Sequence, residues 1–110
     1  MPMATSYETV EPSRAEVDAR SEPVLLEFGA PWCGFCLRAQ SLIEAALASQ
    51  PELAHLKIED GPGQPLGRSF RVKLWPTLVL MSGGAELARV VRPTSAAQIE
   101  DVLARLSTQR

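Results

Sequence analysis

Two cysteines, Cys33 and Cys36, carry the most distinctive chemistry in this chain. They are its only cysteines, and they stand three positions apart where an apolar segment gives way to a helical pattern. Residues i and i+3 of an α-helix lie on nearly the same face, about 4.5 Å apart along the axis, which is within disulfide reach. The pair can therefore open and close as a disulfide without unfolding the chain. This spacing beside a strand–helix–strand pattern favours thiol–disulfide exchange.

Two other roles remain open for the pair, as inert core thiols or as metal ligands. Zinc takes four protein ligands, or three and a water molecule. His55 is the only histidine in the chain, so a single chain does not complete such a site. The sequence also has no glycine-rich nucleotide motif. We therefore expect redox chemistry with no metal and no bound cofactor.

Composition places the chain among ordinary globular proteins. Its 110 residues, 45% of them hydrophobic and 22% charged, suit a single domain over residues 1–110. No apolar run reaches the length of a membrane span, and a formal charge of -2 argues against nucleic acid as a partner. Residues 1–10 lack the basic head and apolar stretch of a secretory signal, so we expect a cytoplasmic protein, and a monomer.

The elements expected before and after the cysteines alternate between helix and strand. Ser13 and Glu16 have capping-box spacing, which predicts a short helix over 14–20. The apolar run 24–28 predicts a strand covered on both faces. A helical pattern then runs from Cys33 until Pro51 stops it.

The second half of the chain predicts three further strands, two of them joined by a hairpin turn, and two helices. In chain order these are a strand over 53–58, a short helix over 66–70, strands over 75–80 and 87–91 turned at Gly83 and Gly84, and a final helix capped by Thr94. Residues 1–10 are expected to be frayed, with a short edge strand from Tyr7 at most. This order predicts an α/β sheet whose first strands are parallel.

With these elements in place, the sequence resembles the thioredoxin family. The matching stretches are Glu27-Phe28 at the end of a strand, Ala30-Pro31-Trp32-Cys33-Gly34-Phe35-Cys36, and Trp75-Pro76-Thr77 some forty residues later. The hairpin and the closing helix extend the likeness over about residues 5–107. The resemblance implies a thioredoxin-like α/β fold, with a central mixed sheet of four to five strands flanked by helices on both faces. It also implies thiol–disulfide exchange and a cis peptide bond before Pro76.

The resemblance assigns different roles to the two cysteines. Cys33 stands at a helix N-terminus, where unpaired N–H groups favour an anion, and is expected to be the nucleophile. Cys36 is expected to be the resolving thiol that releases the reduced substrate. The substrates implied are disulfide-containing proteins, and the electrons would come from a separate reductase.

Glu27 is a carboxylate inside an apolar strand, where burial disfavours its charged form. The resemblance places it at a buried acidic position, usually Asp, that exchanges a proton with Cys36 through water. The alternative is a strand-end carboxylate that reaches solvent. His55 aligns where the family often has Lys, and we favour an ordinary satisfied or exposed histidine over a proton relay.

The expected substrate-binding residues are Trp32, Gly34, Phe35, Trp75, Pro76 and Arg92. A cis bond would leave the Trp75 backbone facing the disulfide, able to pair with an extended substrate segment. Trp32 is expected to cover the rim of the disulfide, and its alternative role is plain hydrophobic cover. An ordinary trans proline at a strand start is the alternative for Pro76.

Three of these residues depart from the commonest family pattern. Phe35 replaces Pro and so adds a backbone N–H, which can point at the Cys33 sulfur and make the disulfide a better oxidant. Trp75 is bulkier than the usual Ile or Val and would narrow the range of substrates. Arg92 replaces part of a small Gly-Ala turn, and can attract an acidic partner, lower the Cys33 pKa or be a solvated surface residue.

These departures leave three functions to separate. The leading one is a protein-disulfide reductase that uses Cys33 and Cys36. The second is a less reducing variant of the same chemistry, an oxidant or isomerase. The third is a redox-inert module that binds a partner through Trp32, Trp75 and Arg92.

Overall fold

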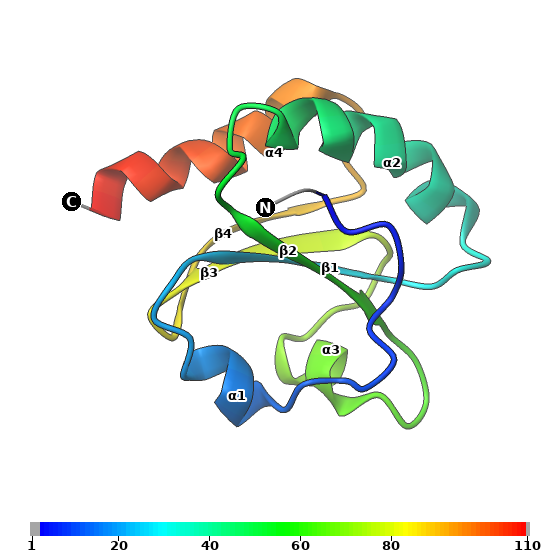
Figure 1. Ribbon diagram of the computed structural model, residues 1–110. Coiled ribbons are helices and arrows are strands. Elements are labelled where there is room, and N and C mark those ends of the chain that lie inside the picture. The colour runs from blue at the N-terminus through cyan, green and yellow to red at the C-terminus, as the bar shows by residue number, and fades with distance from the viewer. Residues whose placement is uncertain (1–2, 110) are drawn as a thin grey trace.

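A four-stranded mixed β-sheet forms the centre of the computed structural model, which describes residues 3–109 (Figure 1). Its strand order is β2-β1-β3-β4. β1 (Val24–Gly29) pairs parallel with β2 (Ala54–Glu59) and antiparallel with β3 (Thr77–Ser82), which pairs antiparallel with β4 (Ala85–Val91). Every residue of β1 is buried, which confirms the prediction from its apolar run. The sheet has four strands, the lower of the two numbers expected from the sequence.

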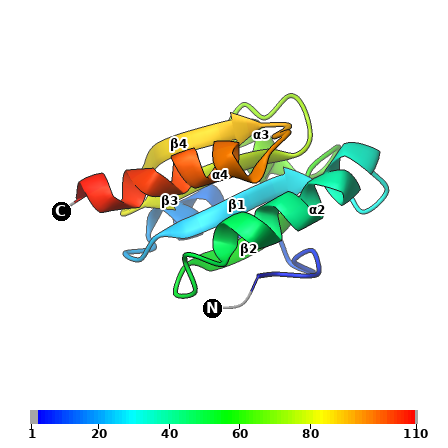
Figure 2. The ribbon, with the colours of Figure 1, turned by 90° about the horizontal axis from the view of Figure 1, so that it is seen from above.

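Helices cover both faces of this sheet, as predicted. α2 (Gly34–Leu47) and α4 (Ala96–Leu103) lie side by side on one face, and α1 (Arg14–Asp18) and α3 (Pro65–Ser69) lie on the other (Figures 1 and 2). The 3-10 helix Ala104–Gln109 continues α4. Each face has its own buried apolar cluster, one built around Leu25 and Ile43 and the other around Phe28 and Phe70. The two clusters pack against opposite faces of β1 in the middle of the molecule.

Two of the helix starts test the capping predictions. Ser13 and Glu16 form the predicted capping box at α1. The prediction that Thr94 caps the last helix is wrong, because Ser95 is the N-cap and its side chain accepts a hydrogen bond from the Gln98 N–H. A capping oxygen has to reach an N–H two or three residues ahead, and Ser95 has that spacing to the helix that begins at Ala96. The Thr94 N–H instead donates to the Gln98 side chain at 2.6 Å.

The turn before β3 places two of the expected site residues outside the sheet. The Trp75–Pro76 peptide bond is cis, and β3 begins at Thr77 rather than at Trp75. Proline has no N–H to donate to a strand ladder, so pairing starts after it. Trp75 and Pro76 therefore lie in the loop between α3 and β3.

The N-terminal segment is attached to the edge of the sheet instead of being frayed. Tyr7 forms an isolated parallel bridge with Lys57, and the Glu8 N–H donates to the Lys57 carbonyl at 2.8 Å. The Ala4 N–H donates to Nδ1 of His55 at 3.0 Å. The expected edge strand is thus reduced to one bridge, and residues 1–2 of the predicted frayed segment lie outside the described residues. Among residues 3–109, no helix has the length and apolar character needed to cross a membrane.

Candidate active site at the start of helix α2

Cys33 and Cys36 meet where β1 leads into α2. Cys33 is the N-cap of the helix, and its sulfur accepts a hydrogen bond from the Cys36 N–H at 3.2 Å. Both residues are free thiols, with exposed fractions of 6% and 2%. Cys33, the less buried of the two residues, lies at the helix N-terminus, where backbone N–H groups favour an anion.

Burial raises the pKa of the Cys36 thiol to about 12. Its hydrogen bond with Cys33 adds to the effect, as do the charges of Cys33 and Glu27, while a backbone hydrogen bond with Ala30 opposes it. Cys36 is therefore a neutral thiol near pH 7. It needs a base nearby before it can attack another sulfur.

Phe35 does not play the backbone role suggested by the sequence. The backbone N–H that donates to the Cys33 sulfur belongs to Cys36, so the prediction that the Phe35 N–H does so is wrong. The N-cap side chain reaches the third residue of the helix, and Phe35 is the second. The ring of Phe35 is exposed, and Gly34 beside it is exposed too.

Glu27 lies fully buried in β1, so the alternative of a solvent-exposed strand-end carboxylate is wrong. One oxygen contacts Nε2 of His55 at 2.9 Å, and the other accepts a hydrogen bond from the Gln40 amide at 2.8 Å. Because Nδ1 of His55 accepts the Ala4 N–H, the ring proton belongs on Nε2, which donates to Glu27. His55 is thus a satisfied, buried histidine. Glu27 accepts two hydrogen bonds, an arrangement suited to a carboxylate.

Trp75, in the loop before β3, packs against the buried cluster formed by Ala30, Cys33 and Cys36. Its indole N–H donates to Asp60 at 2.8 Å, and its ring lies edge-on to Trp32 with the centroids 5.4 Å apart. Trp32 is 74% exposed. The two tryptophans and Phe35 therefore surround the cysteines with aromatic surface, and Trp32 is more exposed than a residue that only covers the core.

Comparison with known proteins agrees with this geometry. A family model described as Thioredoxin matches residues 5–105. Among solved structures, thioredoxin 2 from Pseudomonas aeruginosa PAO1 in its reduced form is 49% identical, with 98% of this chain and 100% of that chain covered and a TM-score of 0.85. A thioredoxin of Mycolicibacterium smegmatis is 30% identical over 80% of this chain and 81% of its own length.

The chain belongs to the thioredoxin family. This confirms the resemblance found in the sequence, the fold class and a thiol–disulfide oxidoreductase chemistry at the two cysteines. A further relative, the bifunctional thioredoxin reductase/thioredoxin of Mycobacterium leprae, is 35% identical over 70% of this chain. This chain spans only 17% of that protein's length.

Tyr7 lies beside Cys36, a contact that the sequence analysis did not predict. The Tyr7 hydroxyl lies next to the Cys36 thiol, and burial together with the charges of Cys36 and Glu27 raises the pKa of that hydroxyl. Gly29 makes room for this contact, because an added Cβ would lie 2.5 Å from the Cys36 sulfur and 3.2 Å from the Tyr7 oxygen. The Tyr7 hydroxyl therefore stays protonated and can act as a donor to Cys36.

Gln40 and Lys57 complete the polar layer beneath the cysteines. The Gln40 amide donates both to Glu27 and to the Cys36 carbonyl, each at 2.8 Å, and its oxygen accepts from Lys57 at 3.0 Å. Lys57 also lies over the Tyr7 ring at 4.8 Å. Gln40 follows Cys36 by four positions and so shares its helix face, which is a signal in the sequence. Tyr7 gave no such signal, because its partners are far away in the chain.

Arg92 follows directly after β4 and is half-buried. Its Nε donates to the Trp75 carbonyl at 2.8 Å, and its guanidinium lies 3.9 Å from the centroid of the Phe35 ring. The alternative of a freely solvated arginine is therefore wrong. Within the described part of the chain, no group of three or more His, Cys, Asp or Glu side chains is placed to hold a metal ion.

Proposed function

We propose that this thioredoxin reduces disulfide bonds in other proteins, with Cys33 as nucleophile and Cys36 as resolving thiol. The observation that carries the proposal is the position of the Cys33 sulfur, at the N-terminus of α2 and bonded to the Cys36 N–H at 3.2 Å. The aromatic side chains of Trp32 and Phe35, next to the two cysteines in the chain, are exposed and offer a surface for a protein substrate.

The reaction moves two electrons and two protons from the dithiol to the substrate. The Cys33 thiolate attacks one sulfur of the substrate disulfide, that S–S bond breaks, and the departing sulfur takes up a proton. Cys36 then loses its proton and attacks the Cys33 sulfur, which releases the second substrate thiol and leaves a Cys33–Cys36 disulfide. A separate dithiol reductase would return the electrons, and the exchange needs no bound cofactor.

Glu27 is the candidate base for the second step. Cys36, with a pKa raised to about 12, carries its proton at neutral pH. The Glu27 charge is close enough to contribute to that rise, and Gln40 bonds to both the carboxylate and the Cys36 carbonyl. A proton leaving Cys36 can therefore be received next to the site, with the Tyr7 hydroxyl stabilising the thiolate that remains.

The donors at Cys33 favour a reductant over an oxidant. A dithiol becomes strongly oxidising when its reduced form is stabilised. In the described residues the Cys33 sulfur has one backbone donor, the N–H of Cys36, and the extra N–H of Phe35 does not add a second. A reductase of this kind would work in a reducing compartment such as the cytoplasm. The fused reductase in the name of the M. leprae relative supports a separate reductase as electron source.

Reduction of insulin disulfides, with dithiothreitol as the electron source, tests this proposal. We expect turnover by the wild type and none by Cys33→Ser. Cys36→Ser should stop after one step, with the substrate held on Cys33 as a mixed disulfide of the expected mass. Turnover by Cys33→Ser at the wild-type rate would contradict the proposal. Binding of insulin without any reduction would favour the redox-inert module instead.

A further inference from the structure

Arg92 joins three parts of the site. Its backbone N–H donates to the Pro76 carbonyl at 2.9 Å, and its Nε donates to the Trp75 carbonyl at 2.8 Å. Its guanidinium then lies against the Phe35 ring, on the first turn of α2. The side chain therefore bridges the turn before β3 and the helix that carries the cysteines.

The bond to Trp75 occupies an acceptor that a substrate would use. An extended substrate segment that pairs with a protein backbone donates its N–H groups to the carbonyl groups of that backbone. In this structure the Trp75 carbonyl is already bonded to Arg92. A substrate strand that pairs with Trp75 must therefore move the guanidinium elsewhere.

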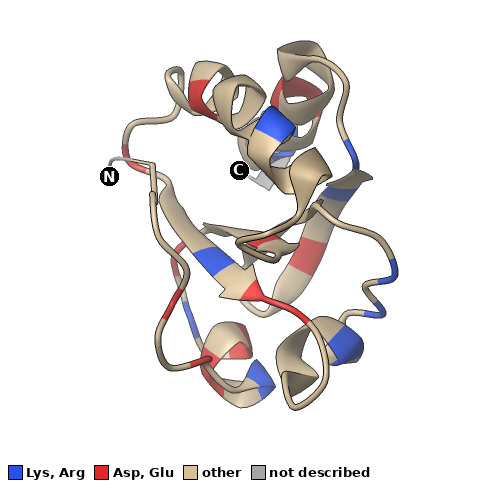
Figure 3. Ribbon diagram, turned by 90° about the vertical axis from the view of Figure 1, so that its right-hand side faces the viewer, with Lys and Arg blue, Asp and Glu red and all other residues tan. Residues whose placement is uncertain are grey.

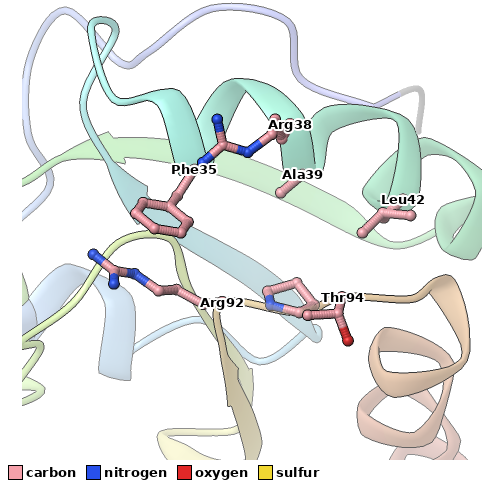
Figure 4. A pocket seen from close by; sticks show the side chains of 7 residues that line it. Phe35, Arg38, Ala39, Leu42, Arg92 and Thr94 are labelled. Carbon is pink, nitrogen blue, oxygen red and sulfur yellow. The ribbon is translucent and has the colours of Figure 1, made fainter.

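A second arginine stands on the other side of Phe35. Arg38, in α2, lies 4.8 Å from the centroid of the same ring, and Figure 4 shows Phe35 between Arg38 and Arg92. No carboxylate among the described residues forms an ion pair with either arginine. The two guanidinium groups border a surface pocket whose remaining lining is mostly apolar: Ala39, Leu42, Pro93 and Thr94.

Charge is distributed unevenly around the site. The chain has a formal charge of -2, yet basic residues line the pocket beside Phe35 and a second surface pocket. The second pocket, at α3 and the loop that follows, includes Arg68, Arg71 and Lys73, and Figure 3 shows Lys and Arg along this edge. Asp60 also borders the second pocket, but its carboxylate accepts the Trp75 indole N–H. In contrast, no carboxylate lines the pocket beside Phe35, so the guanidinium groups of Arg38 and Arg92 make that side of the site positive.

The backbone at Arg92 supports a specific role for its side chain. Arg92 has φ 49°, a conformation that suits glycine and is costly for other residues. Strained backbone positions of this kind cluster at functional sites, which directs attention to the Arg92 side chain. Here it contributes a planar cation with several donors, a shape that matches a carboxylate.

We propose that Arg92, together with Arg38, makes this thioredoxin selective for disulfides in acidic polypeptide segments. A substrate carboxylate draws the Arg92 guanidinium away from the Trp75 carbonyl, and the freed carbonyl then accepts an N–H of the substrate strand. A neutral segment has to displace Arg92 without that compensation. The inference rests on the proposed function, because it concerns the choice of substrate for the same dithiol.

Two peptide disulfides that differ only in Glu or Gln beside the cysteine provide the test. For the wild type, we expect kcat/KM to be about two- to fivefold higher for the Glu peptide, the range of one exposed ion pair. The ratio of the two kcat/KM values should fall towards one in about 1 M salt, because charges are then screened over a distance of about 3 Å. Arg92→Gly should abolish the preference and accelerate the Gln peptide, because the Trp75 carbonyl is then free.

Arg71→Gly is the matched control. Arg71 is also an arginine at positive φ, 58°, but it does not line the pocket beside Phe35. It should keep the wild-type preference. Equal rates for the two peptides in the wild type, or an unchanged preference in Arg92→Gly, would overturn this inference while leaving the reductase intact. No turnover of either peptide would count against the proposed function, and with it against this inference.

Discussion

The imidazole of His55 donates a hydrogen bond to the carboxylate of Glu27 at 2.9 Å, with both side chains completely buried. The pair joins neighbouring strands β1 and β2 directly beneath the two cysteines. Gln40 supplies the second donor to Glu27 and connects it to Cys36. This arrangement holds a carboxylate within the protein interior, close to Cys36, the thiol that we propose to resolve the mixed disulfide.

Glu27→Gln should slow resolution of the mixed disulfide at neutral pH by at least about tenfold, because the amide cannot accept a proton. Attack by Cys33 should be almost unaffected. Single-turnover kinetics with a quenched peptide disulfide measure the two steps separately. Glu27→Asp keeps the carboxylate and serves as the control. Equal lifetimes of the mixed disulfide in the wild type and Glu27→Gln would remove Glu27 from the mechanism.

Tyr7→Phe should lengthen the lifetime of the mixed disulfide by about fivefold, the effect of one lost hydrogen bond to the Cys36 sulfur. The ring, and its contact with Lys57, are retained in this variant. The same single-turnover assay measures the change, and the unfolding midpoint in urea shows whether the fold is intact. A shift in the midpoint with no change in lifetime would mean that Tyr7 only supports the structure.

Cys36 should react as a thiol with a raised pKa. Because the pKa of Cys36 is about 12, its thiolate fraction rises about tenfold per pH unit up to nearly that value. The rise therefore continues above pH 9, where an ordinary thiol is already ionised. In Cys33→Ser, alkylation of Cys36 by iodoacetamide should therefore keep accelerating between pH 7 and 10.5. Burial, the main cause of the shift, is retained in that variant. A rate that levels off near pH 9 would show an ordinary thiol.

Gly29→Ala should destabilise the protein by about 1–3 kcal/mol, because the new methyl group overlaps the Cys36 sulfur. Urea unfolding of the reduced protein measures this loss. Gly34→Ala is the matched control: there the nearest atom is the end of the flexible Arg38 side chain, at 3.3 Å. A similar loss in both variants would contradict the close packing at Gly29.

Local patterns in the sequence were sufficient for the framework of the site. The apolar run of β1, the helical spacing of α2 and the interval between Cys33 and Cys36 each reflect interactions within a few residues. The resemblance added the turn at Pro76. The error at Thr94 has the same local origin, since two adjacent residues both suit an N-cap and only the helix geometry selects Ser95.

Contacts between distant segments could not be predicted in this way. Tyr7 reaches Cys36 because the N-terminal segment lies along β2, and the short edge strand expected from Tyr7 did not indicate that its side chain would lie at the cysteines. Arg92 was recognised as unusual, but its bonds depend on how the end of β4 meets the turn before β3. These contacts come from the tertiary arrangement, and one of them involves Arg92, which departs from the common family pattern.

The reduction potential of the Cys33–Cys36 pair tests the central claim most directly. It can be measured by equilibration with a thiol–disulfide buffer and read from the fluorescence of Trp32 and Trp75. We expect a single reversible two-electron transition below the cytosolic glutathione potential of about -220 to -260 mV, as a reductase requires. A potential well above that range would indicate an oxidant or isomerase, and no reversible transition would contradict a redox function for this pair.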